Sequence, residues 1–262
     1  MEVNKKTGKR KKITTVALLA LIVCLIVCSM VFFHLDRRLP GGTAIFYSPH
    51  PDDEVLSMGS GLLEALDRNE QVIMVLLSQG KASKAIDQVN ERLLQEGYPP
   101  INAEEFGAAR AKEFRESALQ LGVKEENIYL YDLPDGSLNT EEIKEIMTSF
   151  AARYPEAVHH TMTYKDPHRD HAAAGKALQE LKKAGIIRHT VYYIPVQEWE
   201  NLKSLFNHVT KTPPSKLAGH QKALAAYKSW YPAGGRYAIG ITSVPGYFEI
   251  IEGAYQSVWS KR

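Results

Sequence analysis

Cysteine is scarce in this sequence, which has 262 residues and only two cysteines, Cys24 and Cys28. No cysteine follows position 28, so a domain formed by the rest of the chain cannot contain a disulfide. Zinc and related metals are bound in proteins by cysteine, histidine, aspartate and glutamate. Any metal site in that domain must therefore be built from histidine and carboxylate side chains.

The chain also lacks an excess of positive charge outside the amino end. Residues 1–40 hold eight of the 32 basic residues and two of the 30 acidic residues, so 24 basic and 28 acidic residues remain. The remaining part has no basic stripe of the kind that binds nucleic acid, and we expect no nucleic-acid partner. Its length of about 220 residues suffices for one sizeable α/β domain.

The amino end carries an uncharged hydrophobic run over residues 13–33. As a helix, this run would be about 31 Å long, which matches a hydrocarbon core of about 30 Å. Six Lys or Arg residues precede the run and two follow closely, so the positive-inside rule places the N-terminus in the cytoplasm. We expect a single-pass membrane protein with a basic cytoplasmic tail (1–12), a transmembrane anchor (13–33), a linker (34–42) and an extracytoplasmic domain (43–262).

A cleaved signal peptide is the alternative interpretation of this run. Its apolar region would usually have about 7–15 residues and end at a small-x-small site. The run here is longer and no Ala-x-Ala pattern follows it, which favours an uncleaved anchor. A lipoprotein signal fits less well, because Val23 and Val27 precede the two cysteines where a small residue is expected.

Short apolar runs alternate with helical patterns through the first part of the expected domain. The runs cover residues 43–48, 72–78, 128–131, 157–163 and 190–195, and the helical patterns cover 54–68, 103–121, 141–153 and 171–184. Such alternation predicts βαβ units. We therefore expect an α/β fold, a single Rossmann-like domain with a mostly parallel sheet flanked by helices.

The pattern is weaker after Pro195. We expect a helix over residues 216–230 and two late strands over 237–243 and 247–251. Residues 80–100 are rich in charge and end in Pro-Pro, which favours a mobile loop.

The segment 48–54, Ser-Pro-His-Pro-Asp-Asp-Glu, directly follows the first predicted strand. In a parallel α/β sheet, ligands bind at the carboxyl ends of the strands, so this loop offers His50, Asp52 and Asp53 to one cleft. A purely structural interpretation is that the two aspartates cap the next helix, with Glu54 favouring its dipole. The prolines on both sides of His50 stiffen the loop, and capping does not explain them.

The segment 166–171, Asp-Pro-His-Arg-Asp-His, follows the fourth apolar run. His168 and His171 are three residues apart, so they point to the same side at the start of a helix. A His-x-x-His pair alone is often only a surface feature. Two histidines and one carboxylate around an open position, however, form a catalytic zinc site, although these side chains also accept other divalent metals.

The remaining histidines of the expected domain have structural interpretations. His159 and His160 lie within the fourth apolar run, and one of them must face inward if that run is a strand. His189, His208 and His220 have no visible partner in the sequence and are assigned to the surface or the core.

The two segments together resemble the PIG-L/LmbE family of zinc-dependent N-deacetylases, on His50-Pro51-Asp52-Asp53-Glu54 and His168-x-x-His171. The resemblance covers residues 43–175 well and extends to three further motifs: Ser78-Gln79-Gly80, Arg110-x-x-Glu113, and Ala226-Tyr227-Lys228-Ser229. Ser60 and Trp230 depart from the family pattern, where a glycine and a glutamine are usual.

The resemblance implies a role for each matching residue. The zinc ligands would be His50, Asp53 and His171. Asp52 would be the general base that activates water, His168 would stabilise the oxyanion, and Arg110 would contact substrate hydroxyls. The implied substrates are N-acetylated sugars or glycoconjugates that contain N-acetylglucosamine, and the expected anchor favours an extracytoplasmic glycan or glycolipid over a cytosolic thiol sugar.

Three other functions remain open from the sequence. A metal hydrolase for another bond, such as a phosphoester, would usually use more carboxylates to hold two metals. A membrane-tethered sugar-binding protein could keep the metal site without turnover. In a purely structural anchor, the histidines would be incidental. Zinc content separates the last function from the others, and acetate release identifies a deacetylase.

Overall fold

A seven-stranded sheet forms the centre of the computed structural model, which describes residues 42–68, 70–205 and 208–261. The strand order is β3-β2-β1-β4-β5-β9-β6. The strands are β1 (Thr43–Ser48), β2 (Gln71–Leu76), β3 (Ile128–Leu130), β4 (Val158–Met162), β5 (His189–Ile194), β6 (His208–Lys211) and β9 (Gln256–Ser260). The strands β1 to β5 pair in parallel, whereas β9 runs antiparallel to both β5 and β6. The expected mostly parallel sheet is thus confirmed.

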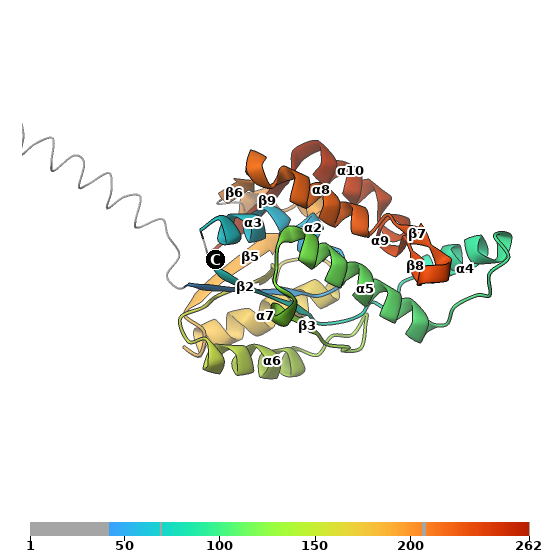
Figure 1. The fold of residues 1–262 in the computed structure, drawn as a ribbon. Helices are drawn as coiled ribbons and strands as arrows, with labels where there is room; N and C mark the ends of the chain where they lie inside the picture. The colour runs from blue at the N-terminus through green and yellow to red at the C-terminus, as the bar shows by residue number, and fades with distance from the viewer. Residues whose placement is uncertain (1–41, 69, 206–207, 262) are drawn as a thin grey trace, which may run out of the picture. The chain divides into compact units, whose positions relative to one another are not determined.

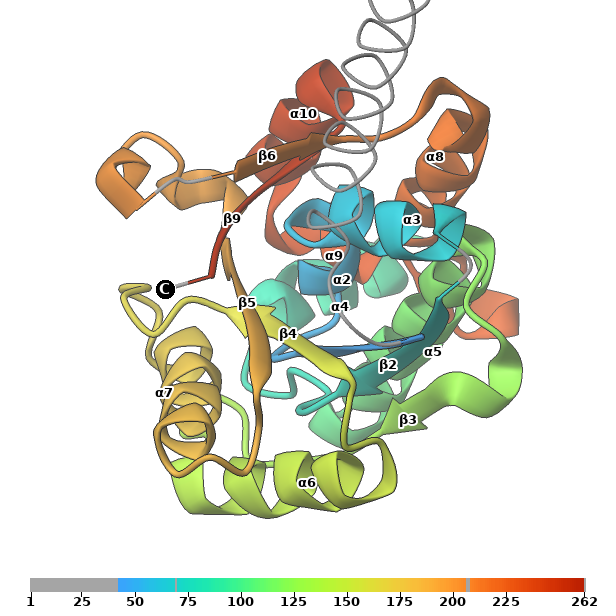
Figure 2. The same cartoon turned by 90° about the vertical axis from the view of Figure 1, so that its left-hand side faces the viewer.

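Helices cover both faces of this sheet (Figure 1, Figure 2). The helices are α2 (Asp53–Leu56), α3 (Gly59–Asp67), α4 (Ala85–Gln95), α5 (Ala103–Leu121), α6 (Thr140–Arg153), α7 (Arg169–Lys183), α8 (Leu217–Ala226), α9 (Ile239–Ser243) and α10 (Pro245–Ala254). The connections from β1 to β3 pass through α3 and α5 on one face. Those from β3 to β5 pass through α6 and α7 on the other face. A right-handed crossover requires this change of face when the strand order reverses.

The strand order reverses between β1 and β4, and this reversal positions the candidate site. Ile45 of β1 pairs with Ile73 of β2 on one side and with His159 of β4 on the other. The chain leaves β1 and β4 in opposite directions, so a crevice opens between the two loops at their carboxyl ends. The two motif segments of the sequence are these two loops.

Both histidines of β4 are buried, on opposite faces of the sheet. His159 faces the layer of α6 and α7, where its Nδ1 lies 3.0 Å from the hydroxyl of Tyr47. His160 stacks on Phe46, with ring centroids 4.1 Å apart. Burial lowers the pKa of His159 to about 4. Only one inward histidine was expected from the sequence, but helices on both faces of the sheet enclose both of them.

The structure corrects the sequence analysis beyond β5. Residues 237–243 and 247–251, which were expected to be strands, lie mainly in α9 and α10. Short apolar runs do not separate helix from strand, and Pro245 at the first turn of α10 is a helix-start signal that the prediction missed. The strands β6 and β9 were missed because long-range pairing stabilises them: β9 pairs with β5, and β6 pairs with β9.

The expected mobile loop at residues 80–100 contains the helix α4. Its residues Ala85, Val89 and Leu93 are spaced four apart and are buried, so they form an apolar face that packs near α9. A smaller difference concerns the predicted helix over residues 54–68, which is divided into α2 and α3.

The expected membrane anchor is not supported by the structure. None of the helices in residues 42–261 is long and apolar enough to cross a membrane. The predicted tail and anchor, residues 1–12 and 13–33, lie outside the described residues, as does nearly all of the linker. The finding contradicts the expected single-pass membrane protein with an extracytoplasmic domain, so the anchor gives no reason to prefer an extracytoplasmic substrate.

Candidate active site

Three predicted ligands converge at the carboxyl ends of β1 and β4. His50 lies in the loop after β1, Asp53 begins α2, and His171 lies in the first turn of α7. The His50 Nδ1 atom is 3.3 Å from His171 Nε2 and 3.6 Å from Asp53 Oδ2, and the last two atoms are 3.2 Å apart. Ligand atoms bound tetrahedrally at about 2.0–2.1 Å from zinc would be about 3.3–3.4 Å from one another. The three side chains therefore fit around one ion of this size.

Carboxylates hold the other nitrogen of each imidazole. His50 Nε2 lies 3.1 Å from Asp170 Oδ2 and 3.1 Å from Asp135 Oδ1, and His171 Nδ1 lies 2.8 Å from Asp166 Oδ2. An N–H that donates to such a carboxylate fixes the tautomer and leaves the opposite nitrogen free to bind a metal. These carboxylates were not among the predicted site residues. Asp166 and Asp170 lie inside the second motif, whereas nothing in the sequence pointed to Asp135.

Electrostatics at this point favour a positive charge. Burial opposes ionisation of His50, but Asp135, Asp170 and Asp53 outweigh it and raise its pKa well above the usual value. Burial also opposes ionisation of His171, yet Asp53 and Asp166 raise its pKa to about 9. Although burial alone would raise the pKa of Asp53, the two imidazoles hold it well below the usual range. The carboxylates that favour positive charge on the two imidazoles would also stabilise a divalent cation between them. The residues therefore fit a metal by charge as well as by distance.

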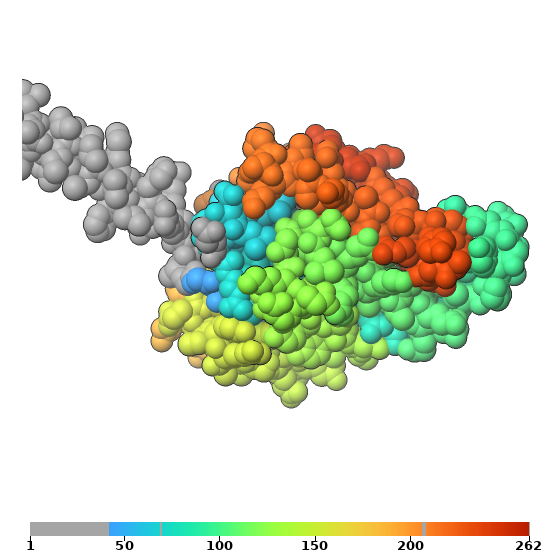
Figure 3. All heavy atoms as spheres, in the orientation of Figure 1, coloured from blue at the N-terminus to red at the C-terminus, as the bar shows by residue number. Residues whose placement is uncertain are grey.

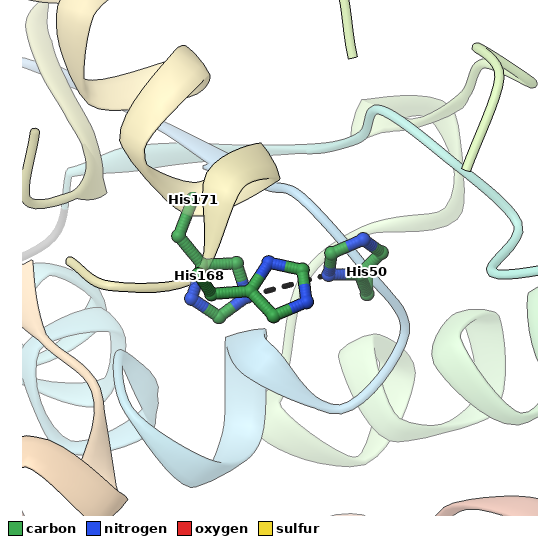
Figure 4. Close-up of side chains that lie close together, drawn as sticks. All are labelled: His50, His168 and His171. Atoms are coloured by element: carbon green, nitrogen blue, oxygen red, sulfur yellow. Dashed lines mark hydrogen bonds between the residues drawn. The ribbon is translucent and has the colours of Figure 1, made fainter. Parts of the chain in front are cut away.

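His168 lies at the rim of the site, directly before α7. Its ring centroid is 5.1 Å from that of His50 and 4.5 Å from that of His171 (Figure 4). One ring nitrogen from each of the three histidines lies within 4.8 Å of the others, so they form a second possible ligand set. Burial and the two neighbouring imidazoles lower the pKa of His168. A neutral His168 can donate a hydrogen bond from its N–H to a ligand in the cleft.

Asp52 lies beside the three converging ligands and is only 7% exposed. Burial raises its pKa to about 7, against the lowering effect of Arg110, and the charge of Asp53 adds to the rise. A carboxylate with a pKa near neutrality can both accept and return a proton at physiological pH.

Arg110 of α5 is buried against the loop after β1. Its Nη2 donates to the carbonyl oxygen of Pro51 at 2.8 Å and to Asp52 Oδ2 at 3.2 Å, and its Nη1 donates to the carbonyl oxygen of Gly80. The structure thus brings Arg110 to the site, where it also lines the cleft. Its contact with a substrate stays a prediction.

A cleft of about 330 Å³ opens above these residues. One wall carries the charged side chains described above. The other wall comes from the carboxyl-terminal part of the chain and is uncharged; it consists of Val196, Gln197, Ser243, Val244 and Tyr247. This wall was not predicted from the sequence, because its residues follow no chemical motif and are brought together only by α9, α10 and the end of β5.

A parallel sheet with histidines and carboxylates converging at its switch point has the arrangement of a metal-dependent α/β enzyme. The family profile described as "PIG-L: GlcNAc-PI de-N-acetylase" matches residues 45–182, which is more than half of the chain. The chain therefore belongs to the PIG-L family, as the sequence motifs predicted, and is an enzyme of the deacetylase type. No curated protein matches the chain by sequence.

Several solved structures share the fold at low sequence identity. The A40926 pseudoaglycone deacetylase Dbv21 has a TM-score of 0.60 and 17% identity, over 83% of this chain and 96% of that chain. The N,N'-diacetylchitobiose deacetylase of Pyrococcus horikoshii has a TM-score of 0.54 and 18% identity, over 84% and 83%. GalB, the 4-carboxy-2-hydroxymuconate hydratase of Pseudomonas putida, has a TM-score of 0.55 and 15% identity, over 83% and 95%. A hydratase among these neighbours means that the fold alone does not determine the reaction.

Proposed function

We propose that the protein is a zinc-dependent hydrolase that removes the N-acetyl group from a glycan or glycolipid containing N-acetylglucosamine. The observation that carries this proposal is the convergence of His50, Asp53 and His171 at mutual distances of 3.2–3.6 Å, with a buried carboxyl, Asp52, beside them. Amide hydrolysis needs an activated water, a polarised carbonyl and a proton for the leaving amine. The site offers a group for each of these tasks.

His50, Asp53 and His171 would hold the zinc ion, with Asp166, Asp170 and Asp135 orienting the two imidazoles. A divalent cation supplies Lewis acidity, which lowers the pKa of a coordinated water and polarises a carbonyl. Asp52 takes the proton of the attacking water on its carboxylate and returns it to the amine nitrogen as the C–N bond breaks. The products are acetate and the free amino sugar.

His168 and Arg110 complete the proposed chemistry. The imidazole of His168 donates an N–H to the negative charge that develops on the acyl oxygen, a contribution worth about 100-fold or more in comparable sites. Arg110 holds Asp52 and the loop after β1, and since it also lines the cleft, it would contact a substrate hydroxyl there.

The shape of the cleft supports a compact, neutral substrate. Its volume of about 330 Å³ is at the small end of ligand pockets, which have about 300–1,000 Å³. The uncharged wall suits a hydroxyl-rich sugar ring. The family description names an N-acetylglucosaminyl lipid, and one structural neighbour is a deacetylase of N,N'-diacetylchitobiose.

The test is acetate release by the purified protein, with zinc added, from N-acetylglucosamine mono- and oligosaccharides and lipid-linked forms. Asp52→Asn should keep its metal and lose about 100- to 10,000-fold in turnover, the usual contribution of a general base. Asp132→Asn, which changes a half-exposed carboxylate of the β3–α6 connection, is the control and should keep full turnover.

Two outcomes would contradict the proposal. Full activity in Asp52→Asn would remove the assigned base. Metal binding without acetate release from any substrate would instead favour a sugar-binding protein or a hydrolase for another bond, which a phosphoester panel would separate.

A further inference from the structure

Asp52 has an unusual backbone conformation for a residue other than glycine. Its φ is 103° and its ψ is −28°, far from the left-handed minimum near φ +57° and ψ +47° that Asn and Asp sometimes occupy. A side chain in such a conformation persists only when surrounding contacts hold the backbone in place. The contacts that hold Asp52 also direct its carboxyl toward the cleft.

The two polar groups of the peptide unit between Pro51 and Asp52 are both held by buried side chains. On one side, Arg110 Nη2 donates to the carbonyl oxygen of Pro51 at 2.8 Å. On the other side, the N–H of Asp52 donates to the hydroxyl of Tyr227 at 2.8 Å and to Glu54 Oε2 at 3.0 Å. The peptide unit can therefore not rotate without breaking bonds at both of its ends.

Tyr227 and Glu54 form one hydrogen-bonded unit. The Tyr227 hydroxyl donates to Glu54 Oε1 at 2.7 Å while it accepts from the N–H of Asp52, so its lone pairs point at the strained residue. Both side chains have 0% exposure. Neither is a ligand in the proposed metal set, and the proposed mechanism uses neither of them.

The carboxyl-terminal part of the chain sets the position of Tyr227. Tyr227 directly follows α8, and its ring packs against Gly240 of α9 so closely that a Cβ on Gly240 would lie 2.5 Å from Tyr227 Cδ1. Phe248 of α10 lies on the ring as well, with centroids 6.1 Å apart. Three helices thus fix a hydroxyl that reaches residues in the first motif, 175 positions earlier in the chain.

We propose that Tyr227 is a positioning residue of the active site: with Glu54, it holds the Pro51–Asp52 peptide in the conformation that aims the Asp52 carboxyl at the cleft. This inference rests on the proposed function in one respect, which is that Asp52 is the general base. The loss of the hydroxyl leaves the metal ligands and the cleft walls in place and loosens only the peptide that carries the base. Turnover should suffer more than substrate or metal binding.

The test compares Tyr227→Phe with wild type and with Tyr193→Phe in the full-length protein. Tyr193 is a matched control, since it is a fully buried tyrosine whose hydroxyl lies 3.3 Å from His160 Nδ1, away from the cleft. Tyr227→Phe should lower kcat by about 10- to 100-fold, as expected for a misplaced catalytic group, without changing KM. Cobalt affinity, followed by visible absorption, should not change. Amide hydrogen exchange at Asp52 should become faster in Tyr227→Phe only.

Acetate release and hydrogen exchange at Asp52 separate this inference from the proposed function. Absence of acetate release by the wild type would contradict the proposed function, and exchange at Asp52 would then decide the positioning role by itself. Wild-type kcat in Tyr227→Phe, or unchanged exchange at Asp52, would overturn the inference. Glu54→Gln gives a second variant if the first does not fold: its single oxygen can replace only one of the two Glu54 oxygens that accept from Asp52 and Tyr227, so the unit loses a bond, and a loss of kcat with faster exchange is again expected.

Discussion

The region matched by the family profile, residues 45–182, and the carboxyl-terminal region, residues 196–261, contribute different chemistry to one cleft. The first region supplies the ionisable groups that line the cleft: His50, Asp52, Asp53, Arg110, Asp135, His168 and His171. The second supplies valines, a glutamine, a serine and a tyrosine. Under the proposed function, the first region would carry out the reaction, and the second would contact the substrate and support the shape of the first.

The two regions are joined by buried polar contacts as well as by packing. The helix α8 packs along α5, and the orange and red atoms of the second region lie directly against the green atoms of α5 (Figure 3). Glu113 of α5 accepts the N–H groups of Ile239 and Gly240 at 2.7 and 3.2 Å. Burial raises the pKa of Glu113 to about 8, against the effect of these bonds. Changes in the second region should therefore reach the site mainly through α5 and Tyr227.

The largest expected effect is the loss of a ligand in the first region. His171→Ala removes one of the three converging ligand atoms, so we expect loss of bound metal and of nearly all turnover. Metal content and the thermal shift on addition of zinc measure the result. The control is His208→Ala, which removes an exposed histidine of β6 and should leave both readouts unchanged. A variant at position 171 that kept full metal content would show that the ion is held elsewhere.

A smaller effect on metal binding is expected for a carboxylate that orients a ligand without binding the metal itself. Asp170 accepts from His50 Nε2 and from the N–H groups of Gly136 and Leu138. In Asp170→Asn, an NH₂ group would face one of these donors, and the orientation of His50 would loosen. Metal affinity should fall by about 10- to 100-fold, as is usual for such supporting carboxylates. Competition with a chelator measures it, and an unchanged affinity would show that Asp135 alone orients His50.

Gly240→Ala tests whether the second region shapes the first. The added Cβ would overlap the ring of Tyr227, so we expect a loss of about 1–3 kcal/mol in the free energy of unfolding and a lower kcat. Gly246→Ala in α10 is the matched control, because its Cβ would meet no atom within 4 Å. That change should be neutral or stabilise by up to about 1 kcal/mol. Equal behaviour of the two variants in chemical denaturation and turnover would contradict the proposed coupling.

The smallest expected effect is on substrate selection. Tyr247 lines the cleft, and no other described residue bonds to its hydroxyl, which leaves that hydroxyl available to a substrate. Tyr247→Phe should raise KM about fivefold, the equivalent of one hydrogen bond of about 1 kcal/mol, and leave kcat unchanged. Steady-state kinetics with the best sugar of the panel measures this. A fall in kcat at constant KM would instead place Tyr247 in the reaction itself.

Sequence patterns predicted the first region far better than the second. The strands β1, β2, β4 and β5 are buried on both faces, so their apolar runs were visible without any knowledge of their neighbours. The edge strand β6 has no such run, and β9 is set by pairing with β5 and β6. The helix α9 is a five-residue element held by Glu113, too short for helical periodicity to show.

The sequence by itself determined the class of fold, the family and the identity of the ligand candidates, because βα alternation and the spacing of histidines and aspartates are local properties of the chain. Only the tertiary structure decided which carboxylates orient the imidazoles, which residues form the uncharged wall, and how Tyr227 reaches Asp52. These are contacts between segments that lie up to 175 positions apart. The uncharged wall and the Tyr227 contact exist only when α8, α9 and α10 pack against the loops of the sheet, and the contacts of Asp135 and Asp170 with His50 exist only when the loops at the ends of the strands meet.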